Sequence, residues 1–231
     1  QASPDAAKQA DSGYVAVWES SNAENDIDIK ARLFSADGAP DGNEFAINST
    51  DEGWQNAPTV GSSSTGKFVV AWQSYGQDGD VEGVYFRRFD TDGTPLSAEV
   101  QANEATDYEQ YEPALAMDQS AGFDGAFALV WTSFLQPGGS DYDIVGRCFA
   151  ASNQPMGTES EFIVNANTDN DQAAPDIAYL PGGPSRYIVT WESKNEDGDN
   201  WGIYAQRLAP TCAKQADPFK VNTTATNVQS Q

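Results

Sequence analysis

Acidic inserts hold the residues whose type and spacing most readily suggest chemistry. Each of four inserts contains two aspartates separated by one residue. The pairs are Asp26 and Asp28, Asp78 and Asp80, Asp141 and Asp143, and Asp197 and Asp199. Calcium binds several carboxylate and carbonyl oxygens of a flexible loop, although the glutamate that completes an EF-hand loop is missing here. We predict calcium as a cofactor at the first, third or fourth pair, with a solvated acidic turn as the alternative.

Three aromatic residues are candidates for contact with a ligand. Trp54 and Trp201 lie in or beside expected loops, outside the repeated positions described below, and Tyr142 lies in an insert equivalent to that of Trp201. Exposed aromatic rings bring a large contact area at little cost in conformational entropy. We predict that these three residues bind sugar rings or protein side chains.

Motifs for catalysis are harder to find. The sequence has no histidine, no Gly-x-Ser-x-Gly motif, no P-loop and no dinucleotide-binding glycine pattern. Two carboxylates could still hydrolyse a glycosidic bond, but no pair stands out among 35 acidic residues. We therefore predict that the chain is not an enzyme and keep a glycoside-hydrolase-like enzyme as an alternative.

The charge balance restricts partners and location. Twelve basic residues stand against 35 acidic ones, which gives a net charge of −23. A field of that sign repels phosphate backbones, so we expect no nucleic-acid partner. No apolar run approaches about 18 residues, so we expect no transmembrane segment. Because such an acidic surface suits a salty or calcium-rich exterior, we predict a secreted, periplasmic or cell-surface protein.

A fourfold repeat must position all these residues. An apolar run ending in Trp-x-Ser occurs at Trp18, Trp72, Trp131 and Trp191. Upstream of each lies Gln-x-x-Pro, which begins at Gln1, Gln55, Gln110 and Gln172. A second apolar-alternating run follows, and a short run then ends each unit at Asn48, Asn103, Asn165 and Asn222. Because the four Trp residues share one position in a buried run, we expect them to pack between units.

Each unit has the pattern of four short strands bounded by Gly, Asp, Asn and Pro, and no window shows a helical period. Four-stranded units arranged radially form a propeller. We predict an all-β fold, a four-bladed β-propeller with four antiparallel strands per blade, as a single domain over residues 1–231. Its units cover residues 1–54, 55–109, 110–171 and 172–231.

The unit pattern carries a resemblance to known repeats. Gln-x-x-Pro, apolar-Trp-x-Ser, Tyr-x-Arg-Arg-Phe-Asp and Glu-apolar-x-apolar-Asn together resemble the propeller-like repeats of large secreted or cell-surface bacterial proteins. The resemblance covers essentially the whole chain. Most such repeats have no assigned function, so the resemblance implies fold and location but no chemistry.

The repeat also predicts ion pairs within the hairpins. Arg32, Arg87 and Arg147 share one position in the third run, and Glu44, Glu99 and Glu161 share one in the fourth, whereas unit four lacks both. We predict a cross-strand Arg–Glu pair in each of the first three units.

The two cysteines lie in neighbouring units. Cys148 is in the third run of unit three, and Cys212 lies just past the third run of unit four. They have neither CxxC nor zinc-site spacing, so one disulfide and two separate thiols are both open. Because neighbouring blades would pack face to face, a bridge is geometrically possible, and we predict it.

Repetition bears on function as well. A repeated unit offers repeated shallow sites, whereas an active site usually breaks symmetry. We predict a non-catalytic binding or structural module, with a protein or glycan at a cell surface as partner or with a place in a larger assembly. A calcium-assisted carbohydrate-binding lectin is the first alternative, and the glycoside-hydrolase-like enzyme is the second.

Overall fold

The computed structural model describes residues 1–21, 26–120, 124–134, 141–157, 161–184, 186–196 and 200–223. In these residues the regular structure is entirely β, which confirms the predicted all-β class. The strands form four antiparallel sheets, and each sheet comes from one repeat unit. We call these sheets blades 1 to 4. No helix long and apolar enough to cross a membrane occurs in the described ranges.

Blades 1 and 2 each place four strands in sequence order. Blade 1 consists of β1 (Ala2–Lys8), β2 (Tyr14–Ser21), β3 (Ile27–Phe34) and β4 (Pro40–Ala46). Blade 2 consists of β5 (Gln55–Ser62), β6 (Phe68–Tyr75), β7 (Glu82–Phe89) and the short β8 (Val100–Gln101).

Blades 3 and 4 repeat this order with one difference. Blade 3 consists of β9 (Gln110–Met117), β10 (Phe127–Phe134), β11 (Tyr142–Phe149), β12 (Pro155–Met156) and β13 (Phe162–Ile163). Its predicted fourth strand is divided, because β12 and β13 both pair with β11. Blade 4 consists of β14 (Gln172–Tyr179), β15 (Tyr187–Lys194), β16 (Trp201–Leu208) and β17 (Lys214–Lys220).

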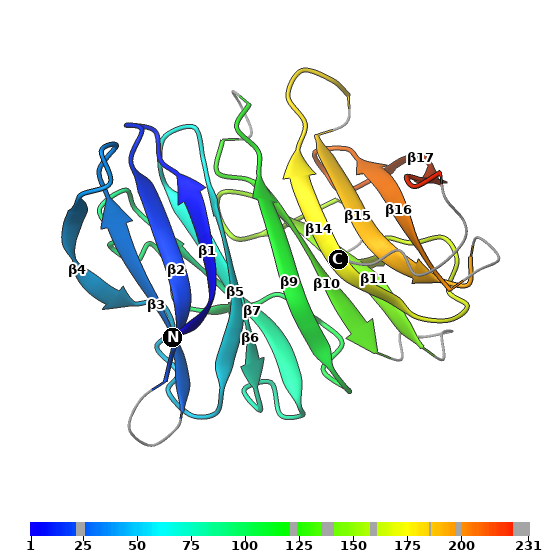
Figure 1. Cartoon of the computed structure of the whole chain (residues 1–231), viewed down its shortest axis with the longest axis horizontal. Helices are drawn as coiled ribbons and strands as arrows, with labels where there is room; N and C mark the ends of the chain where they lie inside the picture. Colours follow the sequence, from blue (N-terminus) through cyan, green and yellow to red (C-terminus); the bar gives the residue numbers. More distant parts are fainter. Residues whose placement is uncertain are drawn as a thin grey trace.

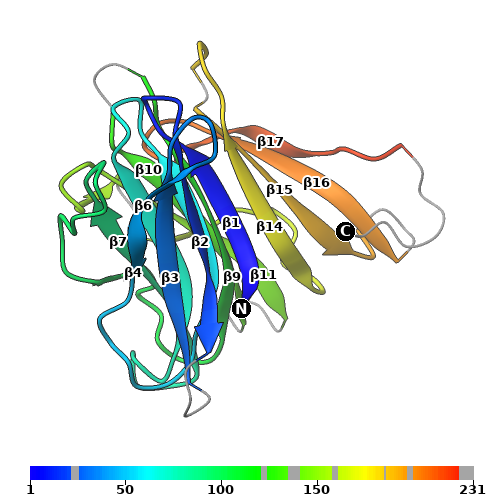
Figure 2. The ribbon, with the colours of Figure 1, turned by 60° about the vertical axis from the view of Figure 1, so that its left-hand side comes forward.

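The blades form an arc around their first strands. β1 packs beside β5, β5 beside β9, and β9 beside β14, and the four strands follow one another across Figure 1. β14 and β1 do not pack in this way. Blade 1 lies at the left and blade 4 at the right in Figure 1, and in Figure 2 β4 lies to the left and β16 to the right. The closed four-bladed ring that we predicted is therefore not formed by the described residues. The four blades leave a wedge open between blade 4 and blade 1.

Apolar residues fill the spaces between neighbouring blades. One core cluster joins blades 1 and 2, a second joins blades 2 and 3, and a third joins blades 3 and 4. Strands β6 and β10 of the middle blades are buried on both faces, whereas β2 and β15 of the end blades alternate between buried and half-buried residues. The end blades thus have one covered face each.

The repeated Trp and the repeated Gln are hydrogen-bonded to each other, which explains why both recur. In blades 2, 3 and 4 the Trp indole N–H donates to the side-chain oxygen of the Gln of Gln-x-x-Pro, as Trp72 does to Gln55 at 2.9 Å. These three Trp side chains are buried, as predicted. Trp18 is only half-buried, because it lies on the uncovered face of blade 1.

The predicted hairpin ion pairs are wrong, and the structure gives the reason. Arg87 donates to Ile47 O of blade 1 at 3.0 Å, and Glu99 accepts from the backbone N–H groups of Ser49 and Thr50. The Arg and the Glu therefore hold the same segment of the preceding blade rather than each other.

Blade 3 repeats this arrangement. Arg147 donates to Ala102 O at 2.8 Å and pairs with Glu104 at 2.6 Å, while Glu161 accepts from Ala105 N–H at 3.1 Å. The Arg and Glu occur together because both serve one inter-blade contact. Sequence repetition revealed the coupling but not the partner.

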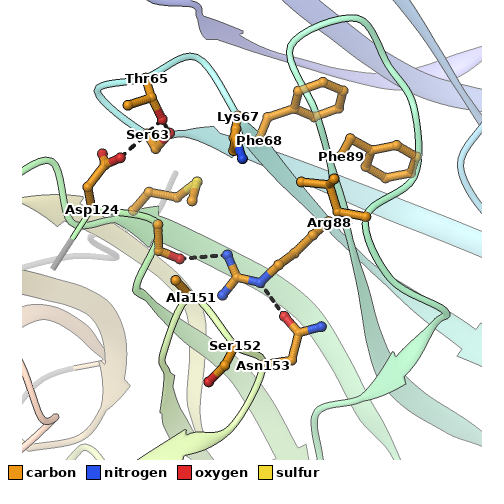
Figure 3. A pocket seen from close by; sticks show the side chains of 13 residues that line it. Ser63, Thr65, Lys67, Phe68, Arg88, Phe89, Asp124, Ala151, Ser152 and Asn153 are labelled. Carbon is orange, nitrogen blue, oxygen red and sulfur yellow. Dashed lines mark hydrogen bonds between the residues drawn. The ribbon is translucent and has the colours of Figure 1, made fainter.

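A second link joins the third strand of one blade to the β-turn of the next. Between blades 3 and 4 this link is the predicted disulfide, Cys148–Cys212, with a Cα–Cα distance of 5.7 Å. Between blades 2 and 3, Arg88 and Asn153 take the equivalent positions and are hydrogen-bonded, as Figure 3 shows. Arg88 also donates to the carbonyls of Gly125 and Ala150, both at 2.6 Å.

Candidate functional site

The four first strands meet around a common hollow of about 390 Å³. Each contributes the residue before the Pro of Gln-x-x-Pro, and each of these residues has a positive φ. They are Ser3 (46°), Ala57 (47°), Glu112 (53°) and Ala174 (51°). A β-bulge lies at this point in every blade. The hollow therefore marks the axis of the arc, and the bulges direct backbone N–H groups across the blade boundaries.

A side chain of the neighbouring blade caps these N–H groups. Glu19 accepts from Ala57 N–H at 2.9 Å, and Gln73 accepts from Glu112 N–H at 3.1 Å. The carboxylate of Glu112 takes the same role for Ala174 N–H. Burial and, to a smaller extent, the charge of Glu192 nevertheless raise the pKa of Glu112. Glu112 is thus an inter-blade cap that faces the axial hollow.

Equivalent residues lie where the first strand begins and the second strand ends in blades 2, 3 and 4. In blades 2, 3 and 4 the last residue of the second strand donates its N–H to the carbonyl of the residue just before the repeated Gln. These bonds join Tyr75 to Trp54, Phe134 to Glu109, and Lys194 to Asp171, at 2.9, 3.0 and 3.0 Å. The first residue of the third strand pairs with the same position, which adds Glu82, Tyr142 and Trp201. We call these nine residues the rim.

The rim combines a repeated backbone with side chains that differ between blades. Blade 2 supplies two aromatic rings and Glu82, blade 3 supplies two aromatic rings and Glu109, and blade 4 supplies an ion pair and Trp201. The repeated Gln, Pro, Trp and Asn have the same residue type in every blade, whereas the residue types of the rim differ between blades. The rim is therefore where the symmetry of the repeat is broken.

Two carboxylates meet on the rim between blades 2 and 3. Burial raises the pKa of Glu82, and the charges of Glu109 and then Asp78 raise it further. Glu109 is held in place because Tyr142 Oη donates to its Oε2 at 3.1 Å. Tyr111 lies beside both, with its ring edge-to-face on Tyr142 at a centroid distance of 5.6 Å. A carboxyl group whose pKa is raised by burial and by a neighbouring carboxylate is a pairing suited to acid–base chemistry.

The predicted ligand-binding aromatics all lie on this rim. Trp54 is 55% exposed and packs against Tyr75 at a centroid distance of 6.3 Å. Tyr142 holds Glu109. Trp201 lies 5.8 Å from the ammonium of Lys194, which forms an ion pair with Asp171 at 2.6 Å. The three aromatics thus lie at the same end of blades 2, 3 and 4, and ligand binding by them stays a prediction.

The predicted metal-binding aspartates have mixed surroundings. Asp28 accepts from Asn48 at 2.8 Å, and Asp143 accepts from Asn165 at 2.6 Å, so both hold the Asn that ends the unit. Asp26 and Asp141 lie two residues away in the described chain, whereas Asp197 and Asp199 lie outside it. The described residues contain no group of three or more metal-ligating side chains. Calcium therefore stays a prediction.

Sequence reasoning did not single out Glu82 and Glu109. Each lies next to a motif that we aligned, since Glu109 directly precedes the repeated Gln and Glu82 begins a third strand. Comparing the units at these flanking positions, where Trp54, Glu109 and Asp171 replace one another, is the signal that could have found the rim.

No protein-family model and no curated protein matches the chain. Solved structures share its propeller fold. A thermostable family-43 glycoside hydrolase aligns with a TM-score of 0.55 and 10% identity, over 98% of this chain and 76% of its own. The catalytic domain of a GH62 α-L-arabinofuranosidase from Coprinopsis cinerea aligns with a TM-score of 0.53 and 11% identity, over 93% and 66%.

A third structure, an N-acetylgalactosamine deacetylase from F. plautii in complex with blood group B trisaccharide, has a TM-score of 0.55 at 14% identity, over 96% and 69%. The chain spans only 65% of the length of a GH62 hydrolase solved with xylotriose. Identities this low establish the shared fold alone.

These comparisons correct our prediction of a non-catalytic module that is not an enzyme. The structures named above are glycoside hydrolases and an N-acetylgalactosamine deacetylase. We had argued that an active site breaks repeat symmetry and that no carboxylate pair stood out. The rim breaks the symmetry, and it does so with a carboxylate pair that only the folded chain brings together.

Proposed function

We propose that the chain is a carbohydrate-active propeller that hydrolyses a glycosidic bond at the rim. The observation that carries the proposal is the pair Glu82 and Glu109, in which burial and the neighbouring charge raise the pKa of Glu82. In this scheme Glu82 is the proton donor to the leaving oxygen. Glu109, held by Tyr142, is the second carboxylate, which acts either as the nucleophile or as the base for water.

The aromatic rings support a sugar as substrate. Pyranose and furanose rings present apolar C–H faces that pack on aromatic side chains. Trp54 and Tyr75 belong to blade 2 with Glu82, whereas Tyr142 belongs to blade 3 with Glu109 and Trp201 belongs to blade 4. In this scheme a chain of several sugar units contacts rings of neighbouring blades beside the bond that is cleaved.

We also infer that the protein works in an oxidising compartment outside the cytoplasm. The disulfide Cys148–Cys212 is compatible with an extracellular location, because such bonds are rare in reducing compartments. The resemblance of the repeats to those of secreted bacterial proteins agrees with this inference. Finding both cysteines reduced in protein isolated from its native source would contradict it.

The test uses 4-nitrophenyl glycosides and unsubstituted oligosaccharides of arabinose, xylose and mannose. The variant Glu82→Gln should lower the rate on unsubstituted oligosaccharides by about 10²–10⁴-fold, the usual contribution of a general acid. It should lower the rate on nitrophenyl glycosides much less, because nitrophenolate leaves without protonation. Glu109→Gln should lower both rates.

Glu52→Gln is the matched control, because it makes the same substitution at an exposed glutamate of the nearby linker. Its rates should equal those of the parent chain. Failure of the parent chain to hydrolyse any substrate of the panel would refute the proposal, as would equal losses for Glu52→Gln and Glu82→Gln.

A further inference from the structure

Two blade faces border the open wedge without a neighbour. Val221 follows β17 and is 50% exposed, whereas Ile47, Ala102 and Val164, which hold the same position in blades 1 to 3, are fully buried. On the other side of the wedge Trp18 is half-buried, although the equivalent Trp residues are buried. Both faces therefore carry the residue types found between blades elsewhere, but these residues are exposed like those of an outer surface.

The face of blade 1 keeps the groups that hold a preceding blade. Arg32 and Glu44 occupy the positions at which Arg87 and Glu99 bind the end of blade 1. Within the described chain, Arg32 donates to Gly42 O of its own blade at 3.0 and 3.1 Å. Glu44 is exposed beside Trp18 in a surface hollow.

The face of blade 4 keeps the groups that hold a following blade. Asp5 accepts from Ala6 N–H and, with its other oxygen, from Val60 N–H of blade 2 at 2.8 Å. Asp176, at the same position in blade 4, repeats the first bond to Ile177 N–H at 2.8 Å and borders the axial hollow.

Arg207 gives a second match on blade 4. It occupies the position of Arg88, whose guanidinium reaches the turn of the next blade (Figure 3) and whose pKa burial lowers to about 10. Arg207 is exposed instead, and its guanidinium lies 5.9 Å from the ring of Phe219, which is itself 45% exposed. Each face thus presents side chains that, in the other blades, bind backbone groups of a neighbouring blade.

We propose that the wedge is the docking surface for one further four-stranded blade of the same repeat. Such a blade offers backbone N–H and C=O groups at the end of its fourth strand for Glu44 and Arg32. It offers a bulged first strand for Asp176 and a turn with free carbonyls for Arg207. A generic apolar partner would bury these four charged groups without the cross-interface hydrogen bonds that a blade supplies, which costs free energy. A whole second copy would bring three more blades behind the one that docks.

The experiment supplies the missing blade covalently. A copy of residues 55–109 is attached after residue 228, which keeps the seven-residue step from Asn to the next Gln found at 48 to 55, 103 to 110 and 165 to 172. The control carries Arg87→Ala and Glu99→Ala in the added blade only. Amide hydrogen exchange is measured for β17 and β2 in the parent chain, the extended chain and the control. Light scattering gives the oligomeric state of each.

In the extended monomer, exchange in β17 and β2 should slow by at least roughly tenfold, because a covered blade opens less often. Acrylamide quenching, compared with a Trp18→Phe version, should show that Trp18 becomes protected. The control should lose most of the protection in β17.

Three results would overturn the proposal. The first is an added blade that itself exchanges like an unfolded chain, because docking is what should fold it. The second is a parent monomer in which β17 and Trp18 are already protected, which would mean that blades 4 and 1 close directly. The third is a parent chain that protects them by self-association, which would make a second copy the occupant. None of these readouts depends on catalysis, so the outcome is separate from that of the hydrolase test.

Discussion

Removal of the Cys148–Cys212 disulfide should selectively release blade 4. The bridge joins residues 64 positions apart, and the chain-entropy model gives such a link about 4 kcal/mol of stabilisation. Both cysteines are buried, at 1% and 6% exposure, so alanine is the least disruptive replacement. We expect Cys148→Ala with Cys212→Ala to lower the free energy of unfolding by about that amount.

The loss of stability should be confined mainly to blade 4. Within the described residues each blade packs mainly against its neighbours in sequence, so stability is approximately a sum of blade and interface contributions. Urea unfolding would give the magnitude, and hydrogen exchange would show where it falls. Protection should drop in β14 to β17 and change little in β1 to β4. The reduced parent chain is the control, because it keeps both sulfur atoms in the core and loses only the bond.

The reasoning would be refuted by a loss below about 1 kcal/mol, since the apolar cluster between blades 3 and 4 would then hold blade 4 without help. A loss spread equally over all four blades would also refute it, because the chain would then unfold as one unit rather than blade by blade.

Three further predictions follow from single side chains. Because the raised pKa of Glu82 makes the folded state bind a proton more tightly than the unfolded chain, stability should fall as pH rises through that pKa. Glu82→Gln should therefore be more stable than the parent in urea unfolding at neutral pH, and this difference should vanish in acid. A variant that is less stable than the parent at neutral pH would contradict the prediction. Asp143 is buried with Oδ2 unpaired in the described structure, and it belongs to one of the predicted calcium pairs. Calcium in hundredfold excess over its Kd should therefore stabilise the chain by about 2.7 kcal/mol. Equal melting temperatures in calcium and in chelator would contradict that site. Trp72→Ala should cost about 3–5 kcal/mol in urea unfolding, and Trp18→Ala clearly less, since only Trp72 is fully buried; equal costs would mean that Trp18 is covered in solution.

The sequence alone determined the local order of the fold. Four copies of one pattern put Gln, Pro, Trp and Asn in one fixed order. Alternating apolar residues with Gly and Asn turns specify strands without tertiary information. Repetition also predicted that Cys148 and Cys212 could meet, because Cys148 lies in the third strand of unit three and Cys212 just past the third strand of unit four. Coupled Arg and Glu positions were visible for the same reason.

Only the tertiary structure decided which groups face each other across blades. Arg87 binds Ile47 O rather than Glu99, since a pattern within one unit carries no information on the rotation between units. The same rotation brings Glu82 of blade 2 beside Glu109 of blade 3 and leaves blade 4 apart from blade 1. Packing angles between sheets are set by the summed shapes of many side chains, so they emerge from the assembled core and not from any motif.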